Sequence, residues 1–320
     1  MDIYRQQFFS QSMPGPVVQP LAQQPVKATE QQLSDIPSSA ARPSLRSNAG
    51  VTPTSLGMTT DTSILDKVSD PKLEIKKEST SPNGLFSVKY ALDAPSPGLS
   101  NITFPMIIDE GLQRKSAMDG GIYYAMVFGL NTEKGTHLAR GYIGMQPRGD
   151  GKALIIFSGY GPNFKAPQGR AEFDGTTGAS NSTLVDFKFG NKYNLSVERD
   201  PADPQILRAF IQDVTNVDNP GPKQHLKDLH VDQKVALAGS ETGFVEQYGA
   251  KINRSSQIAA TEGSFFAPFT TDDKGDVKVG TIKSEGLYGR YKNSIVGKQQ
   301  VVGEPGKAKE IKFSLQGAAV

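Results

Sequence analysis

Cysteine is absent from this chain of 320 residues. Its absence excludes disulfides, thiolate zinc sites, iron–sulfur clusters and thiol catalysis. Tryptophan is absent as well, so tyrosine and phenylalanine are the side chains left to stack on sugar rings. No run approaches the roughly 18 apolar residues that a membrane-spanning helix needs, and we expect no membrane span.

Histidine is scarce, with only His137, His225 and His230 in the chain. The last two are five residues apart, a spacing that suits neither a helical metal pair nor an H-E-x-x-H motif. No serine lies in a G-x-S-x-G elbow, and no G-x-G-x-x-G phosphate loop is present. We therefore predict no catalytic residue, no metal and no cofactor. The formal net charge of +2 also argues against a nucleic-acid partner.

The first 80 residues have the composition of a disordered region. Eight glutamines fall within residues 1–32, and only Asp2, Glu30 and Asp35 are acidic among the first 60 residues. Such a segment cannot bury enough apolar surface to offset its chain entropy. The first residues also lack the apolar core, usually ~7–15 residues long, of a standard secretory signal. We predict a disordered region over 1–80 and a folded domain over 81–320.

From Leu85 onward the pattern becomes that of short strands. Phe86, Val88, Tyr90 and Leu92 alternate with smaller or polar residues, which is the period of a half-buried strand. Pro105 indicates an edge position or a bulge in its strand. Many short strands at close spacing predict an all-β antiparallel sandwich or jelly roll. The expected strands are 86–92, 101–108, 122–130, 138–146, 152–160, 183–189, 192–198, 205–213, 243–248, 260–266, 277–282, 287–291 and 310–315.

Two further segments complete the predicted organisation. The stretch Lys223–Val235 is the one place where a short helix is expected. The last forty residues follow Ala267 without a linker-like run, so we expect them to complete the sandwich instead of forming a separate sheet.

The candidate ligand surface comes from alternation in two neighbouring strands. In 138–146, Ile143 and Met145 share one face and leave Arg140, Tyr142 and Gln146 on the other. Tyrosine rings and planar hydrogen-bonding groups suit flat sugar rings, although tyrosines also commonly cover the edge of a core. The predicted ligand-binding residues are Tyr123, Arg140, Tyr142, Gln146, Tyr160, Asn163 and Phe164.

A hydrolase on a sandwich fold is the enzymatic alternative. Glu241 and Glu246, within GSETGFVEQYG, are the best-placed carboxylates for the pair that a glycosidase requires. The competing interpretation is that both are charged strand residues facing water.

Several short motifs recur in the order found in the DUF3472 family. They are YYAMVFGL, GYIGMQPRGDGKALIIFSGYGP, GNKYNLSVERD, FIQDVTN and GFVEQYG, and the likeness covers roughly residues 85–300. Resemblance to this family implies a β-sandwich of extracellular, often carbohydrate-associated proteins, and it supplies no catalytic residues. The chain departs from the family by lacking cysteine and tryptophan. Ser255 and Ser256 stand where a cysteine-bearing loop is expected, which weakens the case for Sec-type secretion.

The amino-terminal region resembles the type III secretion signals of host-associated bacteria, being rich in Ser, Gln and Pro and poor in acids. We therefore expect a non-enzymatic secreted effector whose sandwich binds a glycan or a host protein. A secretion chaperone would bind the amino-terminal region. The alternatives are a carbohydrate-active enzyme such as a glycoside hydrolase, and a cytoplasmic location.

Overall fold

A computed structural model describes residues 71–79, 83–115, 119–173 and 176–319. The predicted disordered region 1–80 therefore lies outside the described residues, except for its last part. There Ile75–Ser79 form strand β1, which pairs with β15 (Ile252–Arg254) in a two-stranded sheet. The disorder prediction was wrong for these five residues, because the charged run Lys72–Glu78 finds a pairing partner far along the chain.

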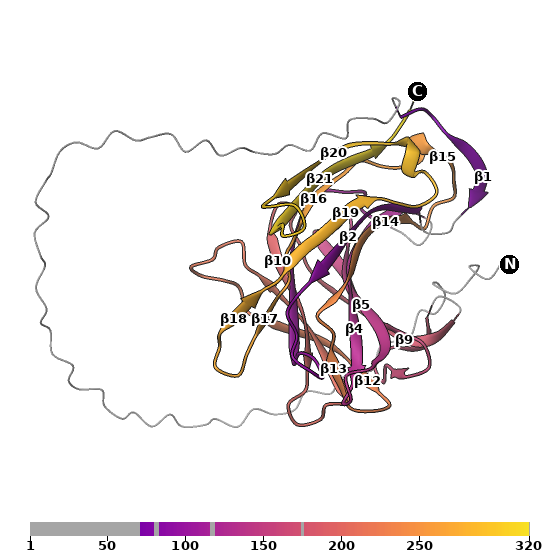
Figure 1. Cartoon of the computed structure of the whole chain (residues 1–320). Coiled ribbons are helices and arrows are strands. Elements are labelled where there is room, and N and C mark those ends of the chain that lie inside the picture. The colour runs from indigo at the N-terminus through magenta and orange to yellow at the C-terminus, as the bar shows by residue number, and fades with distance from the viewer. Residues whose placement is uncertain (1–70, 80–82, 116–118, 174–175, 320) are drawn as a thin grey trace, which may run out of the picture. The chain divides into compact units, whose positions relative to one another are not determined.

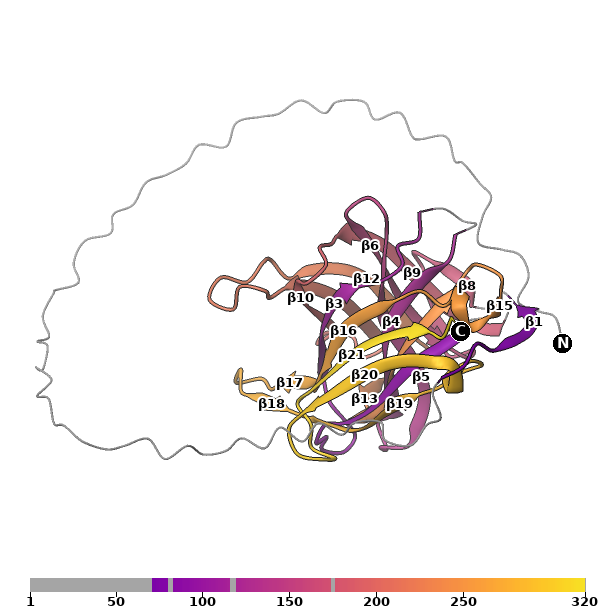
Figure 2. The ribbon, with the colours of Figure 1, turned by 90° about the horizontal axis from the view of Figure 1, so that it is seen from above.

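The fold is all-β and antiparallel, as predicted, and its main body is a sandwich of two large sheets (Figures 1 and 2). The first sheet has ten strands in the order β20 (Ile295–Val302), β21 (Glu310–Gly317), β16 (Thr261–Phe266), β3 (Asn101–Glu110), β10 (Lys192–Arg199), β11 (Ile206–Asp213), β12 (Gln224–Val231) and β7 (Phe164–Lys165). Strand β17 (Phe269–Thr271) also pairs with β3, and β18 (Val277–Val279) pairs with β17. Figures 1 and 2 show β17 and β18 projecting as a hairpin.

The second sheet has nine strands. Their order is β19 (Thr281–Leu287), β2 (Asn83–Ala91), β14 (Ser240–Tyr248), β4 (Gly121–Thr132), β5 (His137–Pro147), β6 (Lys152–Tyr160), β9 (Thr176–Asp186) and β8 (Arg170–Phe173), with β13 (Val235–Leu237) also pairing with β4. Two single-turn 3₁₀ helices, Ser255–Gln257 and Lys292–Ser294, lie between strands.

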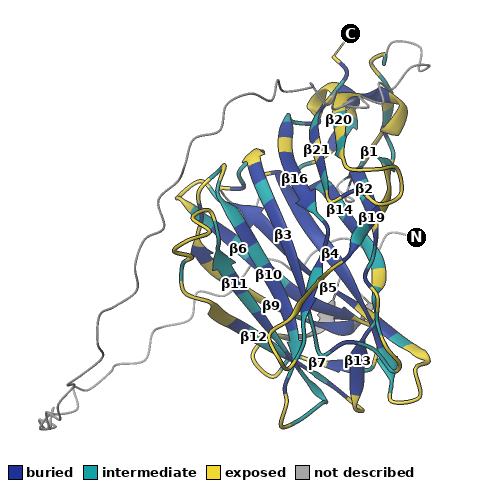
Figure 3. Ribbon diagram, turned by 60° about the vertical axis from the view of Figure 1, so that its left-hand side comes forward, coloured by how far each residue is buried: buried dark blue, intermediate teal, exposed yellow. Residues whose placement is uncertain are grey.

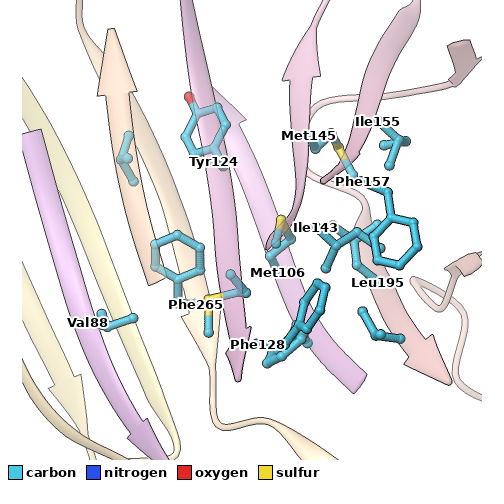
Figure 4. Close-up of a cluster of buried hydrophobic side chains, with 14 of the residues drawn as sticks. Val88, Met106, Tyr124, Phe128, Ile143, Met145, Ile155, Phe157, Leu195 and Phe265 are labelled. Atoms are coloured by element: carbon cyan, nitrogen blue, oxygen red, sulfur yellow. The ribbon is translucent and has the colours of Figure 1, made fainter. Parts of the chain in front are cut away.

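The core lies between the two sheets and is built from alternate residues of each strand. In β4, Tyr124, Met126 and Phe128 are buried there, and in β3 the same role falls to Phe104 and Met106. Figure 4 shows residues from several strands converging in this layer, and Figure 3 shows that the middle strands are buried along most of their length. Each Å² of apolar surface removed from water stabilises the fold by about 25 cal/mol, so this layer is the main source of stability.

The last forty residues complete the sandwich, as expected. Strand β21 pairs with β16 along six residue pairs, and β20 adds the outermost strand of the ten-stranded sheet. At the far end of β21, the Ser255 Oγ donates a hydrogen bond to the Ala318 carbonyl over 2.8 Å. The strand expected over 287–291 does not form, since β19 ends at Leu287 and a 3₁₀ helix follows at Lys292.

The predicted helix over Lys223–Val235 is wrong, since Gln224–Val231 form strand β12. Leu226 and Leu229 are both buried and three residues apart, a spacing that one face of a helix would also produce. A bulge explains this spacing: Ala209 of β11 pairs with Lys227 and Phe210 pairs with His225, so Leu226 is the extra residue. The bulge shifts the inward alternation by one residue.

Pro105 lies inside the sheet and not on an edge strand, because β3 is flanked by β10 on one side and by β16 and β17 on the other. Asn194 of β10 lies opposite Pro105. On the other side, β16 pairs as far as Met106, and β17 pairs at Thr103. On this side of β3, Pro105 therefore lies between the segment paired with β16 and the residue paired with β17, where its missing N–H is tolerated.

Candidate functional site

The outer face of the nine-stranded sheet, turned away from the core, carries a second apolar cluster. Tyr123, Ala125 and Val127 of β4 alternate with core residues and therefore point outward. Tyr142 of β5 belongs to the same cluster, and Phe244 and Tyr248 of β14 pack against it. We call the surface formed by Tyr123, Tyr142, Tyr160, Phe244 and Tyr248 the aromatic face.

Ring-to-ring contacts connect all five members of the aromatic face. The ring centre of Tyr123 lies 5.8 Å from that of Tyr142, 6.0 Å from Phe244 and 6.4 Å from Tyr248. Tyr142 lies 5.5 Å from Tyr160 and 6.0 Å from Phe244. These are the separations at which edge-to-face and offset aromatic pairs are favourable. The consecutive strands β4, β5 and β6, together with β14 from much later in the chain, thus build one continuous surface.

The rings differ in exposure, and this divides their roles. Tyr123 and Tyr142 keep only 5 % and 6 % of their surface accessible, whereas Tyr160 keeps 39 %. Phe244 and Tyr248 are half-buried. The Tyr123 ring lies over Gly144, where a Cβ would approach its hydroxyl to 2.5 Å. Tyr123 and Tyr142 are therefore the base of the face, and the other three rings offer surface to a ligand.

Polar groups border the aromatic face at one end. Arg140 Nε donates a hydrogen bond to Glu241 Oε1 over 2.6 Å, with the arginine side chain largely exposed. Arg140 lies opposite Tyr160 in the pairing of β5 with β6. An exposed guanidinium therefore stands directly beside the most exposed ring.

A second polar pair lies at the β14 side. The Tyr288 hydroxyl donates a hydrogen bond to Glu246 Oε1 over 2.8 Å, and Glu246 lies opposite Tyr123 in the pairing of β14 with β4. Burial, together with the Glu246 charge, raises the pKa of Tyr288 far above its usual value. The phenol therefore remains a hydrogen-bond donor to the carboxylate at every physiological pH.

The third polar group surrounds Tyr248 and Gln146. Tyr124 pairs with Met145, so Gln146 follows beside Tyr123 on the outer side of β5. The Gln146 side chain is completely buried. Arg114 lies over the Tyr248 ring, 5.1 Å from its centre. Burial raises the pKa of Tyr248, and the nearby Arg114 and Gln146 side chains oppose that increase.

The structure brings five of the seven predicted ligand-binding residues to one face and separates the other two. Tyr123, Arg140, Tyr142, Gln146 and Tyr160 share the outer side of the nine-stranded sheet. Phe164 does not belong there: it is 4 % exposed, lies in the main core and packs over Gly159. Assigning Phe164 to the ligand surface was wrong, because the chain after Tyr160 turns toward the ten-stranded sheet.

Asn163 also lies away from the aromatic face. Its Nδ2 donates a hydrogen bond to Asp232 Oδ2 over 3.0 Å, and the Asn163 carbonyl accepts one from the Asp232 backbone. These contacts tie the turn before β7 to the end of β12. Asn163 therefore has a structural partner on the ten-stranded sheet.

Phe244, Tyr248 and Tyr288 were not predicted as site residues. A signal for the first two is present, since Phe244, Glu246 and Tyr248 alternate with the buried Val245 and Gln247. Nothing local marks Tyr288, which reaches the face from the turn after β19 and lies over Gly84 of β2.

Glu241 and Glu246, the predicted carboxylate pair, both belong to β14. Their Cα atoms are five positions apart on β14, about 16 Å at a rise of ~3.3 Å per residue. Glycosidase carboxyls lie about 5–9.5 Å apart. Glu241 is in addition paired with Arg140. The two carboxylates thus have different partners, Arg140 for Glu241 and the Tyr288 hydroxyl for Glu246, and the glycosidase pair stays a prediction.

Among the described residues, no group of three or more histidine or acidic side chains is placed to hold a metal ion. No helix in the described ranges is long and apolar enough to cross a membrane.

Comparisons with known proteins give little information. No family model matches the chain, and no curated protein matches it. Two solved structures of scytalido-glutamic peptidase, each with a transition-state analogue, are similar to 75 % of this chain over 100 % of their own length. The identity is 11 % in both, with TM-scores of 0.36 and 0.39. Similarity at this level assigns neither family nor activity.

Proposed function

We propose that this chain is an exported binding protein whose aromatic face holds a glycan. The observation that carries the proposal is the set of five contacting rings on an outer sheet face, bordered by Arg140–Glu241 and by Tyr288–Glu246. Ligand sites combine apolar and aromatic surface with a few oriented polar groups. The resemblance to carbohydrate-associated sandwiches in the DUF3472 family supports the same ligand class.

The physical fit to a sugar is direct. The C–H face of a pyranose ring stacks on an aromatic ring, and the half-exposed rings of Tyr160, Phe244 and Tyr248 offer such surface. Sugar hydroxyls can donate to the carboxylates of Glu241 and Glu246 and accept from guanidinium groups. Rings that rest on a buried tyrosine base need little reordering when a ligand binds.

Screening the full chain on a glycan array tests this proposal. We expect selective binding to a subset of sugars, which Tyr160→Ala weakens by about tenfold, the effect of losing one aromatic contact worth about 1.4 kcal/mol. A flat signal across all sugars would contradict the proposal.

We propose a type III route for export, supported by the acid-poor amino-terminal composition. Fusing residues 1–80 to a reporter and expressing it in bacteria with a type III apparatus tests the route. We expect secretion that stops when the apparatus is inactivated. Retention of the reporter inside the cell would refute the route and leave glycan binding unaffected.

A second candidate function is hydrolysis of a carbonyl-centred bond, such as an ester or an amide. Glu246 and Gln146 lie on opposite sides of Tyr123, in one row across three strands. A carboxylate can accept a proton from an attacking water, and a carboxamide N–H can stabilise the resulting oxyanion. This row offers one carboxylate where glycoside hydrolysis uses two. The burial of Gln146 makes binding the better-supported function.

Assays of the full chain on ester and peptide substrates test the second candidate. If Glu246 is a general base, Glu246→Gln should lower the rate by about 10²–10⁴-fold. Glu262→Gln, on the other sheet, is the matched control and should leave the rate unchanged. Turnover that survives Glu246→Gln would exclude this role, as would no turnover of any substrate.

A further inference from the structure

Two arginines lie side by side at the Gln146 end of the aromatic face. Arg114 and Arg148 form an isolated parallel β-bridge, and the Arg114 N–H donates to the Pro147 carbonyl over 3.1 Å. The Arg148 side chain in turn donates from Nη1 to the Arg114 carbonyl over 3.4 Å. The backbone therefore fixes Arg114 next to Arg148, the residue that immediately follows the end of β5.

The surroundings of Arg148 are unfavourable for an isolated cation. Burial lowers the pKa of Arg148, and the neighbouring charge of Arg114 lowers it further, against the opposing effects of Tyr248 and Asp150. Arg148 Nε is buried and has no hydrogen-bond partner in the part of the chain that the structure describes. No ion pair between described residues includes Arg148. A half-buried cation without a counter-ion is costly unless an anion completes it.

The neighbouring polar atoms suit an anion as well. Gln146 is fully buried, and neither Nε2 nor Oε1 makes a hydrogen bond of standard geometry to a described residue. Its amide lies near the Tyr248 hydroxyl, which also interacts with Arg114. Lys115 adds a third cation, because its side chain lies against Gly149. Hydrogen-bond donors and positive charge thus gather at one end of the aromatic face.

We propose that Arg148, together with Arg114, forms an anion subsite that selects acidic glycans. A guanidinium binds a carboxylate or a sulfate through two parallel N–H donors, which a lysine cannot reproduce. The ligand would then be a sugar chain carrying a uronic acid or a sulfate ester, with its ring on Tyr248 or Phe244 and its anionic group on Arg148. This inference rests on the proposed function, because it names the class of glycan that the same face binds.

Calorimetric titration of the full chain with three probes tests the subsite. The probes are an oligogalacturonate, a sulfated oligosaccharide of equal length and a neutral cello-oligosaccharide. We expect Arg148→Gln to lower the affinity for the preferred acidic probe by at least about tenfold and to leave the affinity for the neutral probe unchanged. Arg148→Lys keeps the positive charge and controls for a folding defect caused by its loss. It should lower the affinity for the acidic probe to an intermediate degree. Lys298→Gln on β20 is the control and should have no effect.

Thermal stabilisation by inorganic sulfate, relative to chloride at equal ionic strength, separates the two proposals. A rise in melting temperature caused by sulfate, lost in Arg148→Gln, supports the anion subsite even if no glycan binds. Absence of binding to every glycan would then overturn the glycan proposal alone. Equal binding of neutral and acidic probes, unchanged by Arg148→Gln, would overturn the subsite and leave glycan binding intact. The subsite would also be overturned if sulfate raised the melting temperature equally in Arg148→Gln, or not at all, and no acidic probe bound.

Discussion

Phe128→Ala is expected to lower the free energy of unfolding by about 3–5 kcal/mol, the usual cost of removing a fully buried phenylalanine ring. Phe128 has no accessible surface, and its ring centre lies 5.7 Å from that of Phe157 in the layer between the sheets. The ring also covers Gly141, where a Cβ would come within 2.3 Å of it. Alanine would leave a cavity that these strands cannot close, since both sheets hold their spacing through many other residues. Urea unfolding of the full chain measures the change.

Phe210→Ala is the matched control for this experiment. Phe210 is on the outer side of β11, is half-buried, and lies 5.3 Å from the His225 ring. Removing a phenylalanine that faces solvent is expected to cost about 1 kcal/mol or less. Equal destabilisation by the two substitutions would mean that the inward and outward faces of the strands are assigned incorrectly.

Strands that are half-buried could be predicted from the sequence, because their side chains alternate between core and outside. The segments 122–130 and 138–146 fall within β4 and β5 for this reason. Alternation fails where a strand contains a bulge, as at Leu226 in β12. Alternation also does not indicate a strand whose formation depends on a distant partner, as for β1, which pairs with Ile252–Arg254.

The candidate site was predictable only in part, for a related reason. The sequence pattern shows which residues of one strand share a face, and so it joins Arg140, Tyr142 and Gln146. It does not show that β14 lies next to β4, so the rings of Phe244 and Tyr248 could not be added. Phe164 was misplaced because the direction of the chain after the short turn at the end of β6 determines whether this residue faces a ligand or the core. The periodicity of the sequence does not indicate that direction.

Phe244→Ala is expected to produce the largest loss of ligand binding among the substitutions considered. Its ring contacts both Tyr123 and Tyr142 and remains half-exposed, so it connects the buried base of the face to the surface. Aromatic residues at the centre of a contact surface commonly contribute about 2 kcal/mol or more to binding, which corresponds to at least about 30-fold in affinity. Because Phe244 is outside the main core, the variant should remain folded.

If the ligand binds to the outer face of the nine-stranded sheet, substitutions on the two outer faces should differ in their effect on affinity. Calorimetric titration of a glycan selected on the array should show a weakening of about 30-fold for Phe244→Ala. Phe210→Ala, which removes the same side chain from the outer face of the ten-stranded sheet, should change the affinity by no more than about twofold, as for a residue outside the contact surface. Full affinity in Phe244→Ala, or a larger loss in Phe210→Ala, would contradict binding at the outer face of the nine-stranded sheet.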